Sequence, residues 1–559
     1  MEKKRRSGLS IMASLIGLVK PLIVVMVGAV SLGTLGYLCA IFLTILATQM
    51  ILSGLGLMNL VVKNILIAMV VLAIGRGLLH YVEQYCNHYI AFKLLAIIRH
   101  KIFMALRKLC PAKLEGKDKG NLISLITTDI ELLEVFYAHT ISPILIAILT
   151  SLVMIIFIGS YSPWAGIFAT VFYLIVGVVI PMSNGKKGGE KGLKFRNKFG
   201  NLNSYVLESL RGLDETIQYN VGWMRQAKME SESDELAGFQ KELSHMEGWQ
   251  RMVTNLAILL GSFGMLFLTI YLNLKGQIDF TGVVTCTVAM MGSFGPVVAL
   301  SNLSNNLNQT LASGERVLSI LEEEPVVTEI SKADGCQWDA AGQFKGAKAS
   351  HVNFAYQEET ILKDFSMDIE PGKIIGIHGA SGSGKSTLLK LLMRFWDVDK
   401  GRIEISGHDI KEIATENLRN TESFVTQETH LFKDTIGNNI AIGKKNATLE
   451  EIKEAAKKAA IHQFIMSLPE GYDTQVGELG DTLSGGEKQR VGIARAMIHD
   501  GQLMLMDEPT SNLDSLNESI ILKALKESAH EKTVVLVSHR KSTMNIADRV
   551  VEMENGRIS

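Results

Sequence analysis

The residues whose types and spacing most clearly indicate chemistry lie in a glycine-rich segment, Gly379-Ala-Ser-Gly-Ser-Gly-Lys-Ser-Thr387. The run 373–378 before it predicts a buried strand, and the run 386–393 after it predicts a helix. A glycine-rich loop in this context binds phosphate through backbone N–H groups and the helix N-terminus. Lys385 would reach the β- and γ-phosphates of ATP, and the Ser386 hydroxyl would bind Mg²⁺. The residues expected to contact the nucleotide here are Gly379, Ser381, Gly382, Ser383, Gly384, Lys385, Ser386 and Thr387.

A second segment, Leu483-Ser-Gly-Gly-Glu-Lys-Gln-Arg490, opens another predicted helix about a hundred positions later. Ser484, Gly485, Gly486 and Glu487 stand at its start, where a helix N-terminus forms an anion site. This segment resembles the signature of the ATP-binding cassette (ABC) ATPases. The resemblance implies that it contacts the γ-phosphate of ATP held by an opposite cassette, so that hydrolysis requires a dimer.

Polar residues that follow predicted strands complete the expected ATP site. One apolar strand ends in Asp507 and Glu508, and His539 follows another strand thirty-one residues after this pair. Asp507 is expected to hold Mg²⁺, Glu508 to act as general base on the attacking water, and His539 to orient that water. The resemblance adds Gln427 as a contact of Mg²⁺ or the water and Tyr356 as an aromatic stacked on adenine. It also places Asp514 in the ATP site.

The N-terminal half of the chain is markedly apolar, and apolar residues make up 47% of all 559 residues. No residue between Lys20 and Lys63 is charged, which is far longer than the apolar core of a secretory signal. A helix needs about 20 apolar residues to cross about 30 Å of hydrocarbon. The spans predicted on this basis lie near 21–50, 58–80, 137–158, 163–184, 253–274 and 280–301.

Long basic connections, from about 81 to 136 and from about 185 to 252, alternate with short turns between the spans. The positive-inside rule places these connections and both termini in the cytoplasm. Six spans with long inner loops resemble the membrane domain of ABC exporters, which implies that the loop tips, near 111–120 and 216–225, contact a cassette. The fold class expected is therefore an all-α six-span membrane domain followed by an α/β cassette. Its expected parts are a transmembrane domain at 1–315, a linker at 316–345 and a cassette at 346–559.

Composition narrows the function classes. The net charge is −1, which does not favour a nucleic-acid partner, and with six spans it counts against a soluble ABC ATPase acting on chromosomes. The five cysteines show no spacing typical of a zinc site. A channel that uses ATP only for gating remains an alternative, although an intact Glu508 favours turnover. We expect a multi-pass protein of a bacterial inner membrane, whose chain is truncated after Ser559 relative to the family's usual tail.

Polar residues at membrane depth are candidates for a substrate path. The second span carries His80, Tyr81, Tyr85 and His88 near its inner end, and the sixth carries Asn302 and Asn305. Two other interpretations remain open. The first group suits the headgroup region equally well, and interhelical hydrogen bonding explains the asparagines equally well.

The stretch Arg76-Gly-Leu-Leu-His-Tyr-Val-Glu-Gln-Tyr-Cys-Asn-His88 resembles the C-type subunit of the bacterial CydDC exporters. That resemblance implies a heterodimer with a D-type half-transporter and export of cysteine or glutathione. It also implies a link to haem, with His88 at the position of a proposed haem ligand. The alternative is a multidrug or lipid exporter acting as a homodimer or heterodimer.

Overall fold

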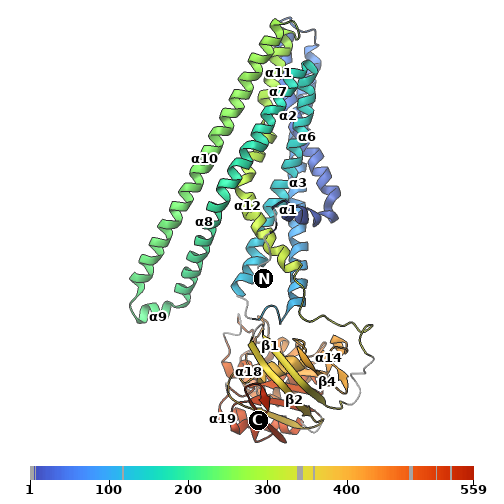
Figure 1. The fold of residues 1–559 in the computed structure, drawn as a ribbon, viewed down its shortest axis with the longest axis vertical. Coiled ribbons are helices and arrows are strands. Elements are labelled where there is room, and N and C mark those ends of the chain that lie inside the picture. The colour runs from blue at the N-terminus through green and yellow to red at the C-terminus, as the bar shows by residue number, and fades with distance from the viewer. Residues whose placement is uncertain are drawn as a thin grey trace. The chain divides into compact units, whose positions relative to one another are not determined.

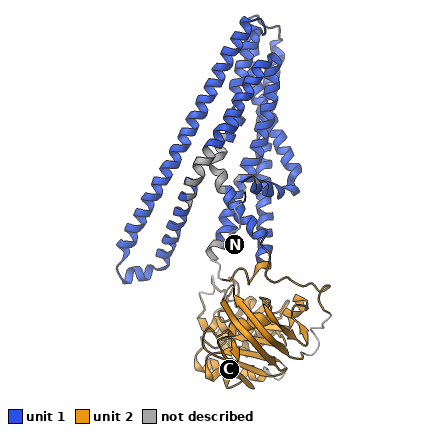
Figure 2. Ribbon diagram, viewed as in Figure 1, with its two compact units in different colours: residues 1–106, 117–323 blue, residues 107–116, 324–559 orange. Residues whose placement is uncertain are grey.

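The protein divides into two compact units (Figure 2). Residues 1–106 and 117–323 form the membrane unit, and residues 107–116 and 324–559 form the cassette unit. Segment 107–116 thus clusters with the cassette although it lies between helices of the membrane unit in sequence. The computed structural model describes residues 6, 8–115, 119–336, 344–356, 359–477, 482–511, 513–528 and 532–558.

The described residues of the membrane unit are helical apart from short connections, and six helical stretches are long and apolar enough to cross a membrane. The expectation of six spans is confirmed. The six stretches are Lys20–Gly54, Val62–Leu109, Leu122–Tyr161, Pro163–Ser183, Gly222–Leu274 and Phe280–Leu300. The α-helices are α1 (Gly8–Gly17), α2 (Ile23–Gly54), α3 (Val62–Leu109), α4 (Lys119–Ser124), α5 (Ile130–Phe136), α6 (Ser142–Tyr161), α7 (Pro163–Leu174), α8 (Ile180–Arg211), α9 (Leu213–Gln218), α10 (Gly222–Leu274), α11 (Phe280–Gly292) and α12 (Gly295–Leu321).

Local sequence explains where these helices start and how closely they pack. Pro163 stands in the first turn of α7, where a missing N–H costs nothing. Asp279 caps α11, because its side chain accepts a hydrogen bond from the Gly282 N–H at 2.8 Å. Gly264 of α10 faces Phe168 of α7 so closely that a Cβ would lie 2.6 Å from the ring. Small residues thus let these two membrane helices approach each other.

The inner connections continue the membrane helices. Figure 1 shows α8 and α10 running side by side and joined by the short helix α9. Likewise α3 extends through the whole basic stretch to Leu109. Helix α12 continues to Leu321, so the first six residues of the expected linker 316–345 are helical.

The cassette unit contains two sheets. An antiparallel sheet has the order β2-β1-β4-β5, and a six-stranded sheet has the order β10-β9-β3-β8-β7-β6, parallel except at β10. The strands are β1 (Ala347–Tyr356), β2 (Glu359–Ile369), β3 (Ile374–His378), β4 (Lys400–Ile405), β5 (His408–Asp409), β6 (Glu422–Val425), β7 (Leu503–Asp507), β8 (Thr533–Ser538), β9 (Arg549–Glu554) and β10 (Arg557–Ile558). The α-helices are α13 (Lys385–Leu392), α14 (Thr415–Thr421), α15 (Ile436–Ala441), α16 (Leu449–Lys458), α17 (His462–Ser467), α18 (Gly485–His499), α19 (Ser515–Ser528) and α20 (Lys541–Met544).

The register of the parallel sheet brings its polar strand ends together. His378 of β3 pairs with Ser538 of β8. Asp507 of β7 pairs with Val537, which is also on β8. Strands β7 and β8 are buried along their whole length, as continuous apolar runs in a covered parallel sheet should be. The residues that follow β3, β7 and β8 therefore meet at one edge, where ligands bind in such sheets.

Candidate active site

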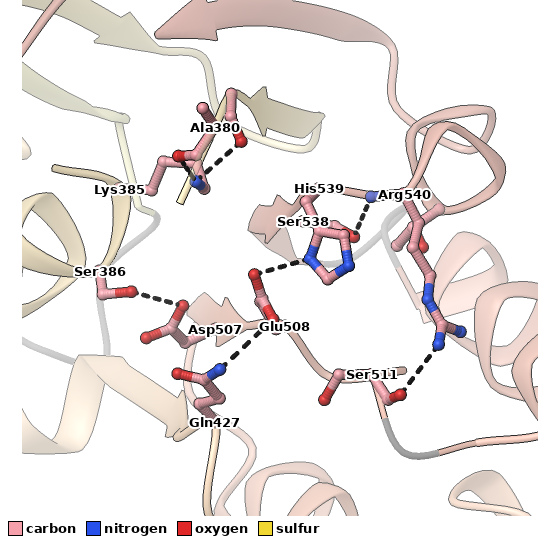
Figure 3. A network of polar contacts seen from close by, with 12 residues as sticks. Ala380, Lys385, Ser386, Gln427, Asp507, Glu508, Ser511, Ser538, His539 and Arg540 are labelled. Atoms are coloured by element: carbon pink, nitrogen blue, oxygen red, sulfur yellow. Dashed lines mark hydrogen bonds and ion pairs between the residues drawn. The ribbon is translucent and has the colours of Figure 1, made fainter. Parts of the chain in front are cut away.

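The phosphate loop connects β3 to α13. Gly382 and Gly384 adopt φ values of +80° and +101°, which residues with a side chain rarely adopt. Lys385 is 5% exposed, and its Nζ donates to the carbonyl oxygens of Gly379 and Ala380 at 2.9 and 2.6 Å (Figure 3). Burial lowers the pKa of this ammonium. The loop thus holds a cation among backbone groups, as phosphate binding requires.

The expected magnesium ligands lie on adjacent elements. The Ser386 hydroxyl donates to Asp507 Oδ1 at 2.9 Å, and Gln427 follows β6, the strand next to β7 (Figure 3). Burial raises the pKa of Asp507, and the Ser386 hydrogen bond opposes that shift. Hydroxyl, carboxylate and amide oxygens are donors that suit Mg²⁺, so this set fits the ion. Ser386, Asp507 and Gln427 would hold the ion, which would supply positive charge against the phosphates.

Glu508 lies at the centre of the polar network in Figure 3. Its Oε1 is 2.9 Å from His539 Nδ1, and its Oε2 accepts from Gln427 Nε2 at 3.4 Å. Its backbone is left-handed, with φ +48°, and its N–H donates to the Val537 carbonyl at 2.9 Å. A strained backbone at one glutamate is typical of a functional position that its surroundings hold in place. The structure therefore brings together the three side chains expected to handle the attacking water.

The signature segment begins α18. Ser484 is the N-cap, and it exchanges hydrogen bonds with Glu487 in a capping box. Ser484 and Gly485 are exposed, so the first turn of a 15-residue helix is open to solvent. Farther along the same helix, Gln489 Nε2 donates to the Glu508 carbonyl at 2.8 Å. The signature helix therefore supports Glu508 of its own chain while its N-terminus faces outward.

Two residues support the site in ways that the sequence analysis missed. Gln489 is one, and Arg540 is the other: its Nη2 and Nη1 donate to the carbonyls of Ser511 and Thr510 at 2.9 and 3.1 Å. The one feature of the sequence that could have indicated a role for Arg540 is that it directly follows His539. Asp514 accepts from the Asn517 N–H at 2.8 Å and so stabilises the start of α19.

Tyr356 ends β1 beside α13 and contacts the Trp396 ring edge-on at a centroid distance of 5.4 Å. Burial raises the pKa of its phenol. Thr387, also expected to contact the nucleotide, is buried in the first turn of α13. Ser383 is buried as well, whereas Ser381 is exposed at the tip of the loop.

Replacing Tyr356 with alanine is expected to raise the KM for ATP about tenfold, because stacking of a base on an aromatic ring is worth roughly 1–3 kcal/mol. Tyr356→Phe retains the ring and should keep a KM close to that of the wild type. Steady-state ATPase assays on both variants measure the effect. An unchanged KM in Tyr356→Ala would show that Tyr356 does not hold the adenine.

The candidate substrate-path residues are spread over several environments. His80 Nδ1 lies 3.0 Å from Glu83 Oε2, whereas Tyr81 and Tyr85 are exposed. His88 contacts the His139 ring edge-on at 5.7 Å. The side chains of Asn302 and Asn305, on α12, lie outside the described part of the structure.

Comparisons with known proteins agree with this geometry. The family model described as "ABC transporter" matches residues 362–511, and the one described as "ABC transporter transmembrane region" matches residues 22–297. A Haemophilus influenzae protein named "Probable ABC transporter ATP-binding/permease protein" is 46% identical over 99% of this chain and its own full length. The chain belongs to the ABC transporter family. This ABC transporter also superposes on a bacterial Atm1-family ABC exporter with ATP bound, with a TM-score of 0.84 and 25% identity over 97% of this chain and 94% of the other.

A third relative is more distant in sequence. A lipid A-core flippase of Syntrophus aciditrophicus is 28% identical over 89% of this chain and 82% of its own length. The exporter architecture, with membrane and ATP-binding domains on one chain, is thus established, and so is ATP hydrolysis coupled to transport. ABC exporters work as dimers in a membrane, in keeping with the outward-facing signature turn of α18.

Proposed function

We propose that this ABC exporter moves a small solute out of the cytoplasm: a thiol such as cysteine or glutathione, an amino acid-like compound, or haem. The observation that carries the proposal is a polar cluster on α3. Glu83 and Asn87 are 3% and 2% exposed, and the Asn87 amide donates to Glu83 Oε1 at 2.6 Å. Among the residues that the structure describes, the hydrogen-bond and ion-pair partners of Glu83 are His80, Gln84 and Asn87. All three are on α3, so these contacts do not join Glu83 to another helix. A buried carboxylate in a membrane segment is costly, which favours a role in recognising a polar solute.

A neighbouring hollow on the same helix supports haem as one member of this set. It encloses about 480 Å³ and is lined by Tyr85, His88, Tyr89, Phe92, Lys93 and Ala96. His88 Nδ1 is buried without a hydrogen-bond partner among the described residues, and it lies 4.0 Å from Glu134 Oε1. An imidazole nitrogen, flanking aromatic rings and a lysine suit an iron ligand, a planar macrocycle and its carboxylates. His88, Tyr85 and Lys93 are the residues that would hold such a group.

We also propose that segment 107–116 and helix α9 transmit the energy of ATP hydrolysis to the membrane helices. Ala112 packs against the cassette core, and Lys390 of α13 forms an ion pair with Glu115. The first connection is thereby linked to the helix that follows the phosphate loop. Leu213 and Ile217 of α9 are 50% and 70% exposed, which supports an apolar tip that seats on a cassette.

In the proposed cycle Lys385 holds the phosphates, while Gln427 and His539 position the attacking water beside Glu508, which takes its proton. The first turn of α18 would bind the γ-phosphate of ATP on the partner. We propose a D-type half-transporter as that partner, on the strength of the α3 resemblance, and a bacterial plasma membrane as the location.

Two relatives support a different substrate class. The flippase is named for lipid A-core, and a Bacillus subtilis protein that is 33% identical over 86% of this chain and 82% of its own length is named for multidrug export. A multidrug or lipid exporter, working as homodimer or heterodimer, is therefore the second candidate. It differs from the first in predicting stimulation of hydrolysis by hydrophobic compounds.

The deciding experiment measures ATP hydrolysis by the purified protein, with and without a co-purified partner, against rising cysteine, glutathione and haem. The proposal predicts that at least one of them raises the rate, because substrate binding promotes closure of the cassettes. His88→Gln should abolish a response to haem, whereas His245→Gln, at an exposed site on α10, should not. Strong stimulation by hydrophobic drugs with no response to the three solutes would refute it in favour of the second candidate.

A further inference from the structure

A second cavity in the cassette unit lies apart from the residues assigned to ATP. It encloses about 360 Å³ where segment 107–116 packs against the stretch 327–329 and against α14 and the end of α13. The side chains that matter for its chemistry are those of Arg107, Lys108, Glu329, Arg394, Phe395 and Arg419. Its volume is in the range of small-molecule sites.

The wall of this cavity is strongly cationic. Four of its lining side chains are Arg or Lys, and one is a carboxylate. Arg107 lies 4.0 Å from Glu329, a distance that leaves the pair weak and both groups more than half exposed. Lys108 is exposed and has no ion pair or hydrogen bond to its side chain within the described ranges. Segment 107–116 thus brings two cations, Arg107 and Lys108, to the cavity. Glu329 is the one acidic side chain in the lining.

Arg394 is the most informative of these residues, because it is buried and incompletely paired. It is 6% exposed, and its backbone is left-handed, with φ +47°. Its Nε donates to Asp397 Oδ1 at 3.2 Å, and its two terminal nitrogens have no acceptor among the residues that the structure describes. These nitrogens are not fully enclosed, so a ligand that enters the cavity can accept hydrogen bonds from them.

Arg419 adds a second guanidinium close to the first. It donates to the Met393 carbonyl at 2.6 Å and to Glu422 Oε2 at 3.2 Å, and its Cζ lies over the Phe395 ring, 5.1 Å from the centroid. Glu422 is wholly enclosed, and burial raises its pKa to about 8, while the ion pair with Arg419 opposes that shift. Burial lowers the pKa of Arg419, and the charge of Arg394 acts in the same direction. Each arginine thus has one acidic partner, Asp397 for Arg394 and Glu422 for Arg419, and both guanidinium groups line the cavity.

We propose that this cavity binds a phosphate-type oxyanion, held by Arg394 and Arg419 from the cassette and by Arg107 and Lys108 from segment 107–116. Guanidinium groups present paired N–H donors that match phosphate oxygens, and the unused Arg394 donors supply this geometry. Because the ligand contacts both sides of the cavity, it fastens segment 107–116 to the cassette. The site thereby regulates how firmly the first connection follows movement of the cassette.

The test must separate this site from the phosphate loop, which also binds phosphate. Glu508→Gln protein, purified as the dimer and saturated with Mg-ATP, has its nucleotide sites filled. Isothermal titration with inorganic phosphate then reports binding elsewhere, and a parallel titration with glycerol 3-phosphate shows whether the ligand is free phosphate or a phosphate ester. A second readout is alkylation of Cys110, an exposed free thiol that lines the cavity, with Cys336 as reference.

We expect saturable binding that protects Cys110 but not Cys336. Lys108→Gln should weaken it about tenfold, since a hydrogen bond to a charged group is lost. Lys523→Gln removes an exposed lysine on α19 and should leave binding unchanged. Both substitutions are at exposed sites, so neither should disturb folding. Absence of binding for both anions, or equal affinity in Lys108→Gln and its parent, would overturn the proposal.

Discussion

Replacing Glu508 with glutamine is expected to lower the rate of ATP hydrolysis about 100-fold or more, because a positioned general base typically contributes roughly 10²–10⁴ in rate. ATP binding should survive, since Lys385 and the glycine-rich loop are untouched. Glutamine has the same shape and can still bond to His539 and Gln427, which contact the two carboxylate oxygens at 2.9 and 3.4 Å. What it cannot do is accept the proton of the attacking water.

The measurement pairs steady-state hydrolysis with equilibrium binding of a fluorescent ATP analogue. Glu450→Gln is a matched control, because Glu450 lies on α16, bonds to Lys453 and is exposed. It should hydrolyse ATP at the rate of the wild type. A near-normal rate in Glu508→Gln would mean that another group activates the water and that the assignment of Glu508 is wrong.

Replacing Ser484 with arginine is expected to lower the rate of ATP hydrolysis about as much as Glu508→Gln does, while the same chain still binds ATP. The substitution places a long cation at the first turn of α18, which we propose closes on the nucleotide of the partner. Loss of preorganised donors at a developing charge typically costs about 10²–10³ in rate. The phosphate loop of the altered chain is unaffected, so its own affinity for ATP should stay within a factor of about two, the scatter expected for distant sites.

The capping function of Ser484 needs its own control, because loss of an N-cap costs about 1 kcal/mol of stability. Helix α16 supplies one: Thr448 forms the same kind of capping box, with Glu451 in place of Glu487. Thr448→Arg should lose similar stability in thermal unfolding yet retain hydrolysis. If both variants lost activity equally, the effect of Ser484→Arg would be one of folding, and the role in the partner's site would be refuted.

Most of the ATP site could be predicted from sequence because its parts are local. The phosphate loop needs glycines, a lysine and a helix start within nine positions, and the structure places Gly382, Gly384 and Lys385 accordingly. Apolar runs likewise predicted six spans, since membrane helices must be long and uncharged to cross hydrocarbon. Asp507 and Glu508 could be placed because parallel strands end at a common edge.

Other features depended on residues that are distant in sequence. The Gln489 bond to the Glu508 carbonyl and the Arg540 bonds to Thr510 and Ser511 join segments whose spacing carries no pattern. The link between Glu115 and Lys390 joins positions 275 residues apart. Side chains of this kind are placed by packing of whole elements, which no local motif encodes.

The sequence by itself determined that this protein is a membrane-embedded ATPase, and it predicted the side chains that we propose contact nucleotide and water. Periodicity and short motifs suffice for that, because each reflects a local physical requirement. Only the tertiary structure decided that segment 107–116 clusters with the cassette, and that Arg394 is buried with unused donors beside Arg419. Burial and charge balance are properties of assembled elements, so the cationic cavity could not be seen until those elements were packed.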